Sequence, residues 1–325
     1  MNENPIHSHY SNRRRFLQMT AAGASALAFS PSKTQAAAPG VKMFKNLSGG
    51  HIGLNANQKE AIELAAKYGF GGVTPHIGEL SKMSAEQRKE ITALMQEKGL
   101  RWGAGGLSVN FRGDEETFKK SLAAYPDEAK LMHDLSISRV ATWIMPGNND
   151  LTYLENFEMH RRRLKECARI LKDHGVRLGL EFVGPRDTRK RFRFAFVCTQ
   201  REMLELCDAI GTGNMGLLLD CWHWYTSHGT AEELAQLTNE QIVLVHVNDA
   251  PPDIPIDEQQ DLKRQLPCTS GVIDMKAFIN GLYKIGYDGP VECEPFDNEL
   301  RKMETEPKLE KTIAALDRTF KLIEA

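Results

Sequence analysis

The sequence predicts an α/β protein built as a single TIM barrel of eight β/α units, and three observations support this fold. The chain has 325 residues, of which 41% are hydrophobic and 26% are charged, as is ordinary for a globular domain of this size. From Met43 onward, short apolar runs alternate regularly with longer stretches of helical periodicity. No change in composition separates these units, so one barrel covering 43–325 is expected.

The first half of the predicted barrel contains four pairs of strand and helix. The first helix has small apolar residues at Ala61 and Ala65, on one face of a 3.6-residue period. The second helix opens with Ser84, followed three residues later by Gln87, which is the pattern of a capping box. The expected strands cover 44–47, 71–74, 102–106 and 139–144, and the helices that follow them cover 57–68, 84–98, 114–135 and 154–174.

The second half repeats this alternation with more strongly apolar strands. Three leucines, Leu217 to Leu219, lead into Asp220, and such a run is typical of a parallel strand that is buried on both faces. Parallel strands of a barrel bring their carboxyl ends to one rim. The expected strands cover 177–182, 216–220, 242–249 and 290–296, and the helices cover 199–210, 231–237, 274–285 and 305–323.

Each of these four strands carries one metal-type side chain near its carboxyl end, namely Glu181, Asp220, His246 and Glu294. Taken alone, Asp220 would be interpreted as the cap of the following helix. Four such residues in chain order predict instead that they converge on one point of the rim. Three carboxylates and one imidazole suit a single divalent cation, Mn²⁺, Mg²⁺, Co²⁺ or Zn²⁺. Glu292 faces the same way lower in the barrel and is interpreted as an interior carboxylate.

Residues near this rim are candidates for substrate binding. Trp222 and His223 follow Asp220 within an aromatic run that predicts a lined pocket. The long loop 184–197 contains Arg186 and four further basic residues, which form either a solvated charge run or a clamp for a substrate anion. The long loop 251–270 contains Arg264, and long loops at this face of a barrel are usually functional.

Residues 1–38 are predicted to be a cleavable signal peptide and linker. Arg13 and Arg14 precede Phe16-Leu17, an apolar stretch over 19–29 and a small-residue region over 34–39, in the order of a twin-arginine (Tat) signal. The apolar stretch is too short for a membrane span, so stable membrane insertion is not expected. The protein is therefore expected to be periplasmic, or otherwise exported through the Tat pathway.

Net charge and cysteine spacing bear on nucleic-acid binding and on the state of the thiols. The net charge of −2 becomes more negative once the basic leader is removed, so no nucleic acid partner is expected. The six cysteines form no CxxC pair, and most are interpreted as core thiols. The sequence leaves the oligomeric state open, and a homo-oligomer is compatible with it.

From about Met43 to its end, the chain resembles the xylose-isomerase-like TIM-barrel superfamily of sugar isomerases and epimerases. The motifs that carry this resemblance are Leu180-Glu181, Asp220-x-x-His223, 245–249, 286–290 and 294–296. The resemblance implies that Glu181, Asp220, His246 and Glu294 bind one divalent metal. It also implies that Glu181 and Glu294 form the acid/base pair.

The same resemblance places His223 and Arg264 against substrate oxygens. The chain departs from the superfamily pattern at Pro267-Cys268-Thr269-Ser270-Gly271, where a Pro-Gly turn is common. This departure leaves the geometry of the loop near the substrate open.

The function implied is a metal-dependent sugar isomerase or epimerase that abstracts a proton next to a carbonyl and passes through an enediolate. Its partner would be a small-molecule sugar or an oxidised glycoside. The main alternative is a lyase or hydratase that acts on 3-oxo-glycosides by elimination at the same site. An endonuclease of the same fold is disfavoured, because the third strand ends in Gly105-Gly106-Leu107 without a histidine ligand. A non-catalytic sugar-binding protein would have no need of four ionisable ligands.

Overall fold

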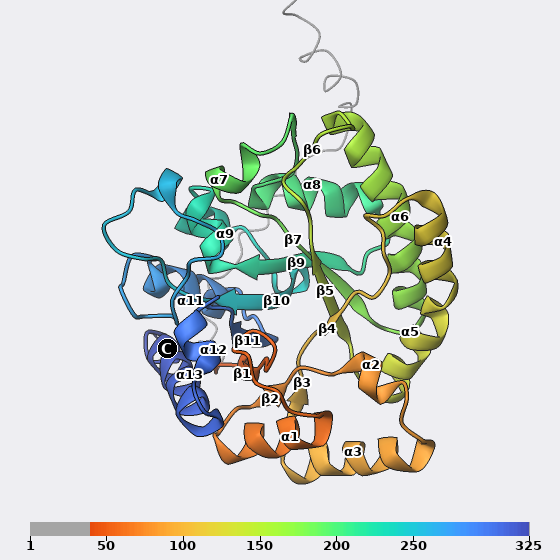
Figure 1. The fold of residues 1–325 in the computed structure, drawn as a ribbon, viewed down its shortest axis with the longest axis vertical. Coiled ribbons are helices and arrows are strands. Elements are labelled where there is room, and N and C mark those ends of the chain that lie inside the picture. Colours follow the sequence, from red (N-terminus) through yellow and green to blue (C-terminus); the bar gives the residue numbers. More distant parts are fainter. Residues whose placement is uncertain (1–39, 325) are drawn as a thin grey trace, which may run out of the picture. The chain divides into compact units, whose positions relative to one another are not determined.

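The computed structural model describes residues 40–324, and these residues form one compact unit. The predicted signal peptide lies outside the described residues. Figure 1 shows the strands at the centre of this unit, with the helices arranged around them. Among the described residues, no helix is both long and apolar enough to cross a membrane.

Nine strand segments form one parallel sheet, in the order β3-β2-β1-β11-β10-β9-β7-β5-β4. β3 and β4 are the two ends of the single strand predicted over 102–106, so the chain between them closes the ring of eight. This arrangement confirms the predicted TIM barrel. The segments are β1 Phe44–Leu47, β2 Gly72–Val73, β3 Arg101–Trp102, β4 Gly105–Gly106, β5 Arg139–Trp143, β7 Arg177–Glu181, β9 Met215–Asp220, β10 Ile242–Val247 and β11 Pro290–Cys293.

The third strand is interrupted at Gly103, which the sequence did not predict. A Cβ atom at Gly103 would lie 2.6 Å from Nδ2 of Asn46, a side chain of β1. Real Cβ atoms do not approach neighbouring atoms this closely, so glycine leaves the space that Asn46 occupies. The missing side chain of Gly103 therefore leaves room for a buried polar side chain inside the barrel.

The helices begin and end close to where the sequence places them. The predicted capping box of Ser84 and Gln87 is present, and Asn57 forms a second one with Glu60 that was not predicted from the sequence. The helix expected over 114–135 is instead two helices, because Pro126 starts a new one in its first turn. The main helices are α1 Gln58–Lys67, α3 Ala85–Glu97, α4 Glu115–Ala123, α5 Tyr125–Asp134, α6 Tyr153–Asp173, α8 Gln200–Ile210, α10 Ala231–Ala235, α11 Met275–Lys284 and α13 Thr305–Phe320.

Short elements that the sequence did not predict occupy the loops: α2 Ile77–Leu80, α7 Arg186–Arg189, α9 Cys221–Thr226, α12 Asn298–Lys302, the 3₁₀ helices η1 Asn239–Gln241 and η2 Ile256–Glu258, and the strands β6 Gly147–Asn148 and β8 Phe194–Ala195. β6 and β8 pair antiparallel and tie the loop after β5 to the loop after β7. Asp257 of η2 connects the two long loops, because its carboxylate lies 3.5 Å from Arg186, and it also lies 3.0 Å from His228, which follows α9.

The inside of the barrel is filled by a small cluster that is separate from the main core. Its members are Ala104, Ala141, Leu218 and Leu244. Because side chains alternate along a strand, the residues two positions further on point into the barrel as well. Those residues are Trp143, Asp220 and His246, so the packed layer supports the residues at the carboxyl rim.

Candidate metal centre and active site

The structure brings the four predicted ligands together at the carboxyl rim. Glu181 ends β7, Asp220 ends β9, His246 lies near the end of β10, and Glu294 directly follows β11. One potential ligand atom from each residue lies within 4.8 Å of all the others. Nδ1 of His246 is 3.6 Å from Oε1 of Glu181, 3.7 Å from Oδ2 of Asp220 and 3.5 Å from Oε2 of Glu294.

These separations fit a metal centre better than a hydrogen-bond network. They exceed the range of ordinary hydrogen bonds. Two ligands that each lie ~2.1 Å from one ion are roughly 3.0–3.4 Å apart, which is close to the observed spacing. Oε1 of Glu181 and Nδ1 of His246 are also buried and find no hydrogen-bond partner in the described part of the chain. The residues present therefore fit one divalent cation.

Asp220 has two roles, and the interpretation as a helix cap is also correct. Its Oδ1 accepts hydrogen bonds from the backbone N–H of Trp222, at 2.7 Å, and from Nδ2 of Asn248, at 3.0 Å. The first of these bonds caps α9. Its Oδ2 faces His246 and Arg264. The cap and the amide thus fix the carboxylate so that its other oxygen points into the site.

Arg264 supplies the positive charge beside these carboxylates. Its Nη1 lies 2.8 Å from both Oδ2 of Asp220 and Oε2 of Glu294. Its Nη2 donates to Oδ1 of Asp261 at 2.8 Å. The side chain is buried, so these charge-assisted bonds are shielded from water. Arg264 thereby anchors the loop 251–270 to the metal-type residues.

The surroundings of the three carboxylates shift their pKa values in different directions. Burial raises the pKa of Glu181 above its ordinary value. Burial also opposes ionisation of Glu294 and Asp220, but His246 and Arg264 together lower the pKa of each below its ordinary value. The two proposed acid/base residues therefore differ in how readily they hold a proton.

Two of the four predicted substrate-binding residues, His223 and Arg264, lie in the site, whereas Trp222 and Arg186 do not line it. His223 lies in the site, with Nε2 at 3.2 Å from Nη2 of Arg264 and 3.9 Å from Oε1 of Glu181. Trp222 is completely buried and lies below Arg264, whose Cζ is 5.3 Å from the centroid of the Trp222 ring. This burial makes Trp222 a support for Arg264 and not the pocket lining that was predicted. Arg186 is exposed on α7 and faces Asp257, so its contact with a substrate stays a prediction.

Two residues that were not predicted as site residues, His51 and Trp143, also lie at the carboxyl rim. His51, in the loop after β1, lies with Nε2 at 3.5 Å from Oε1 of Glu294 and with Nδ1 at 3.6 Å from Oε1 of Glu292. Trp143 ends β5, pairs in register with Glu181, and is 42% exposed. Arg112 lies 4.0 Å from the centroid of the Trp143 ring. An inward position two residues after Ala141 could have indicated Trp143, whereas His51 belongs to no periodic segment.

The loop that departs from the superfamily pattern is held by Asp249, which lies two residues after the end of β10. Oδ2 of Asp249 accepts hydrogen bonds from the backbone N–H groups of Thr269, Ser270 and Gly271, at 2.8–3.0 Å. Cys268 has a φ of 58°, in the left-handed region that favours glycine. The loop therefore keeps a turn at the position where Gly is usual and fixes it through Asp249.

Comparison with known proteins gives one family. The family described as xylose isomerase-like TIM barrel matches residues 62–319. An inosose isomerase of Bacillus velezensis is 25% identical over 258 residues, which cover 78% of this chain and 88% of that protein. A 3-dehydroshikimate dehydratase of Pseudomonas aeruginosa is 24% identical over 257 residues, which cover 78% of this chain and 38% of that protein.

Solved structures show the same fold. A xylose isomerase domain protein from Alicyclobacillus acidocaldarius is 30% identical, with a TM-score of 0.76, over 86% of this chain and 99% of that one. The IolI protein with a bound zinc atom is 22% identical, with a TM-score of 0.70, over 86% of this chain and 98% of that one.

Proposed function

The chain belongs to the xylose isomerase-like TIM barrel family, and on this premise we propose that it is a divalent-metal-dependent isomerase or epimerase of a sugar or oxidised sugar. The observation that carries the proposal is the meeting of Glu181, Asp220, His246 and Glu294 at one rim. Similarity to an inosose isomerase supports the reaction class. The proposed reaction moves a proton at the carbon next to a carbonyl group.

Glu181 and Glu294 are the proposed acid and base. They come from β7 and from the end of β11, with the strands of Asp220 and His246 between them, so they flank the site. A cation held by both carboxylates would keep each of them ionised, as a proton acceptor must be, and the contact with Arg264 distinguishes Glu294 from Glu181. A divalent cation bound here would supply Lewis acidity to a carbonyl oxygen.

Arg264 and His223 are proposed to hold substrate oxygens. Both are buried beside the carboxylates and present nitrogen atoms to the same space. The exposed ring of Trp143 offers an apolar surface at the mouth of the barrel, next to Glu181. Sugar rings pack well against such surfaces through their C–H groups, so Trp143 is proposed as one wall of the substrate site.

The second candidate function is a lyase or hydratase on a 3-oxo-glycoside. The same proton abstraction gives elimination when a leaving group lies one carbon further on. Similarity to a dehydratase over 78% of this chain favours this alternative. Both functions use the same acid/base residues and differ in the fate of the carbanion.

Isotope exchange separates these functions. The metal-loaded protein is incubated in D₂O with a panel of ketoses, inososes and 3-oxo-glycosides, and the products are followed by NMR. An isomerase or epimerase incorporates deuterium and yields an isomeric sugar, whereas a lyase releases the leaving group. The absence of exchange and conversion with every compound, in protein shown to contain the metal, would contradict the proposal.

A further inference from the structure

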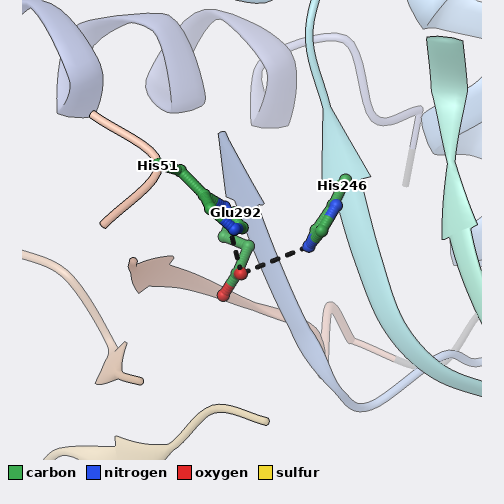
Figure 2. Close-up of side chains that lie close together, drawn as sticks. All are labelled: His51, His246 and Glu292. Carbon is green, nitrogen blue, oxygen red and sulfur yellow. Dashed lines mark ion pairs between the residues drawn. The ribbon is translucent and has the colours of Figure 1, made fainter. Parts of the chain in front are cut away.

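Glu292 is a buried carboxylate one layer below the proposed ligands, and it lies next to the ring of one of them, His246. It lies on β11, and Figure 2 shows it between His51 and His246. Its Oε1 is 3.3 Å from Nε2 of His246, which is the ring nitrogen that points away from the other three ligands. Glu292 therefore faces His246 from the side opposite the proposed metal.

The other oxygen of Glu292 is held by two polar side chains. Oε2 accepts hydrogen bonds from Nδ2 of Asn46 at 2.5 Å and from Oγ1 of Thr74 at 3.3 Å. Asn46 has its place because Gly103 has no side chain. These contacts leave Oε1 to face His246 and His51, so Asn46 on β1, Thr74 and the space left at Gly103 together orient one carboxylate oxygen.

The ring of His246 needs such a partner. A neutral imidazole that binds a metal through Nδ1 carries its proton on Nε2. An ionised carboxylate only accepts hydrogen bonds, so Glu292 favours the tautomer with Nε2–H. Partners of this kind orient the histidine ligands of metal sites.

We propose that Glu292, oriented by Asn46, is a positioning residue that fixes the ring and the Nε2–H tautomer of His246, so that Nδ1 is presented to the metal. This inference rests on the proposed metal-dependent function and assigns its metal affinity partly to residues that do not touch the ion. Glu292 acts through His246 and is not itself a ligand.

The same side chains could instead hold a second cation, because His51, His246 and Glu292 also place potential ligand atoms within 4.8 Å of one another. The shared ring of His246 argues against this arrangement. Nδ1 of His246 faces the first site, and a neutral imidazole that binds a metal through Nδ1 has its proton on Nε2, which leaves no lone pair there for a second ion. The metal stoichiometry distinguishes the two arrangements.

The test exchanges the hydrogen-bonding roles of Asn46 and Glu292. In Glu292→Gln, the donors of Asn46 and Thr74 keep the amide oxygen, so the amide NH₂ faces Nε2 of His246. We expect zinc affinity, measured by chelator competition, to fall about 10–100-fold. In Asn46→Asp/Glu292→Gln, the new aspartate accepts from the amide NH₂, and the amide oxygen turns back toward Nε2. We expect affinity to return to near the wild-type value.

Nitrogen-15 NMR of the zinc-loaded protein, with labelled histidine, provides a readout that a general loss of stability does not change. Wild type and the double variant should show His246 with a proton on Nε2 and zinc on Nδ1, and Glu292→Gln should lose this signature. Unchanged affinity and spectrum in Glu292→Gln would overturn the proposal. So would two zinc ions per chain in wild type with one lost in His51→Ala.

This experiment also separates the inference from the proposed function. If the zinc affinities and spectra follow the expected order but no sugar shows exchange, the proposed reaction fails while the role of Glu292 stands. If wild type exchanges deuterium normally and the Gln variant binds zinc as wild type does, the positioning role fails alone.

Discussion

Glu181 and Glu294 contact the same imidazole nitrogen from different strands, but their neighbours differ. Glu181 lies beside His223, whereas Glu294 lies between Arg264 and His51. The cationic guanidinium favours the ionised form of Glu294, and within residues 40–324 no arginine makes an equivalent contact with Glu181. This asymmetry would allow one residue to give a proton while the other takes it.

Replacing either residue with glutamine tests this division of roles. Glu181→Gln and Glu294→Gln keep an oxygen for the metal but remove the ionisable group. We expect metal content to fall only partly, while turnover falls by at least about 10²-fold, because the lost proton transfer acts in the transition state. In an epimerase, each variant should still exchange deuterium with only one of the two epimers. Near-normal turnover in either metal-loaded variant would remove that residue from the mechanism.

Arg264 compensates for the buried charge of Asp220 and Glu294 when no metal is bound. In Arg264→Met both carboxylates lose this partner, and we expect the metal-free protein to lose roughly 3 kcal/mol of stability. A bound cation restores a positive charge, so adding metal should raise the melting temperature more in the variant than in wild type. Thermal and urea unfolding, with chelator and with Mn²⁺, measure both effects. Arg264→Lys is the control that keeps the positive charge. The prediction would be contradicted if metal raised the melting temperature of Arg264→Met and of wild type equally.

At the scale of an element, α6 contains a buried histidine that the proposed mechanism does not use. Nδ1 of His160 donates to the backbone carbonyl of Asn156, one turn earlier, at 2.8 Å. Its ring centroid lies 5.8 Å from that of Phe111 and 5.0 Å from that of Phe196. Burial in these surroundings lowers the pKa of His160 to about 4.

This shift predicts a loss of stability in acid. Between pH 6.5, the ordinary histidine pKa, and about pH 4, the unfolded chain binds a proton that the folded chain does not. Stability therefore falls as the pH decreases through this window, by up to roughly 3 kcal/mol. In His160→Gln we expect the slope of unfolding free energy against pH to be smaller between pH 4 and 6.5. His133→Gln, at an exposed site, is the control, and an unchanged slope in His160→Gln would contradict the prediction.

The long apolar strands made most of the barrel predictable from the sequence, but the interruption of its third strand was not predictable. Runs such as Leu217–Leu219 identify a buried strand and, with it, the residue at its carboxyl end, so the four ligand-type residues followed from strand periodicity. The need for glycine at position 103 depends on the side chain of Asn46, which is 57 positions away in sequence, and periodicity cannot detect it. His51 reaches the site from an irregular loop, and the burial of Trp222 depends on how α9 packs.

At the scale of the molecule, the site exists only when the barrel is closed. Its four ligand-type residues come from four strands, and Arg264 reaches them from a loop that Asp249 fixes. Asn46 and Thr74, which orient Glu292, come from the opposite end of the chain. An unfolded chain brings none of these groups together, so metal binding and folding are thermodynamically linked.

This linkage fits the export of a folded protein, and we propose that the predicted leader at residues 1–38 directs it to the Tat pathway. A chain that folds before export can take up its metal in the cytoplasm, where competition among metals differs from that outside. Replacing Arg13 and Arg14 with lysine should leave the protein uncleaved in the cytoplasm, as measured by cell fractionation and the mass of the mature chain. Arg15→Lys is the matched control, because it changes an adjacent arginine outside the pair and should leave export intact. Unchanged periplasmic delivery of the double variant would rule out this route.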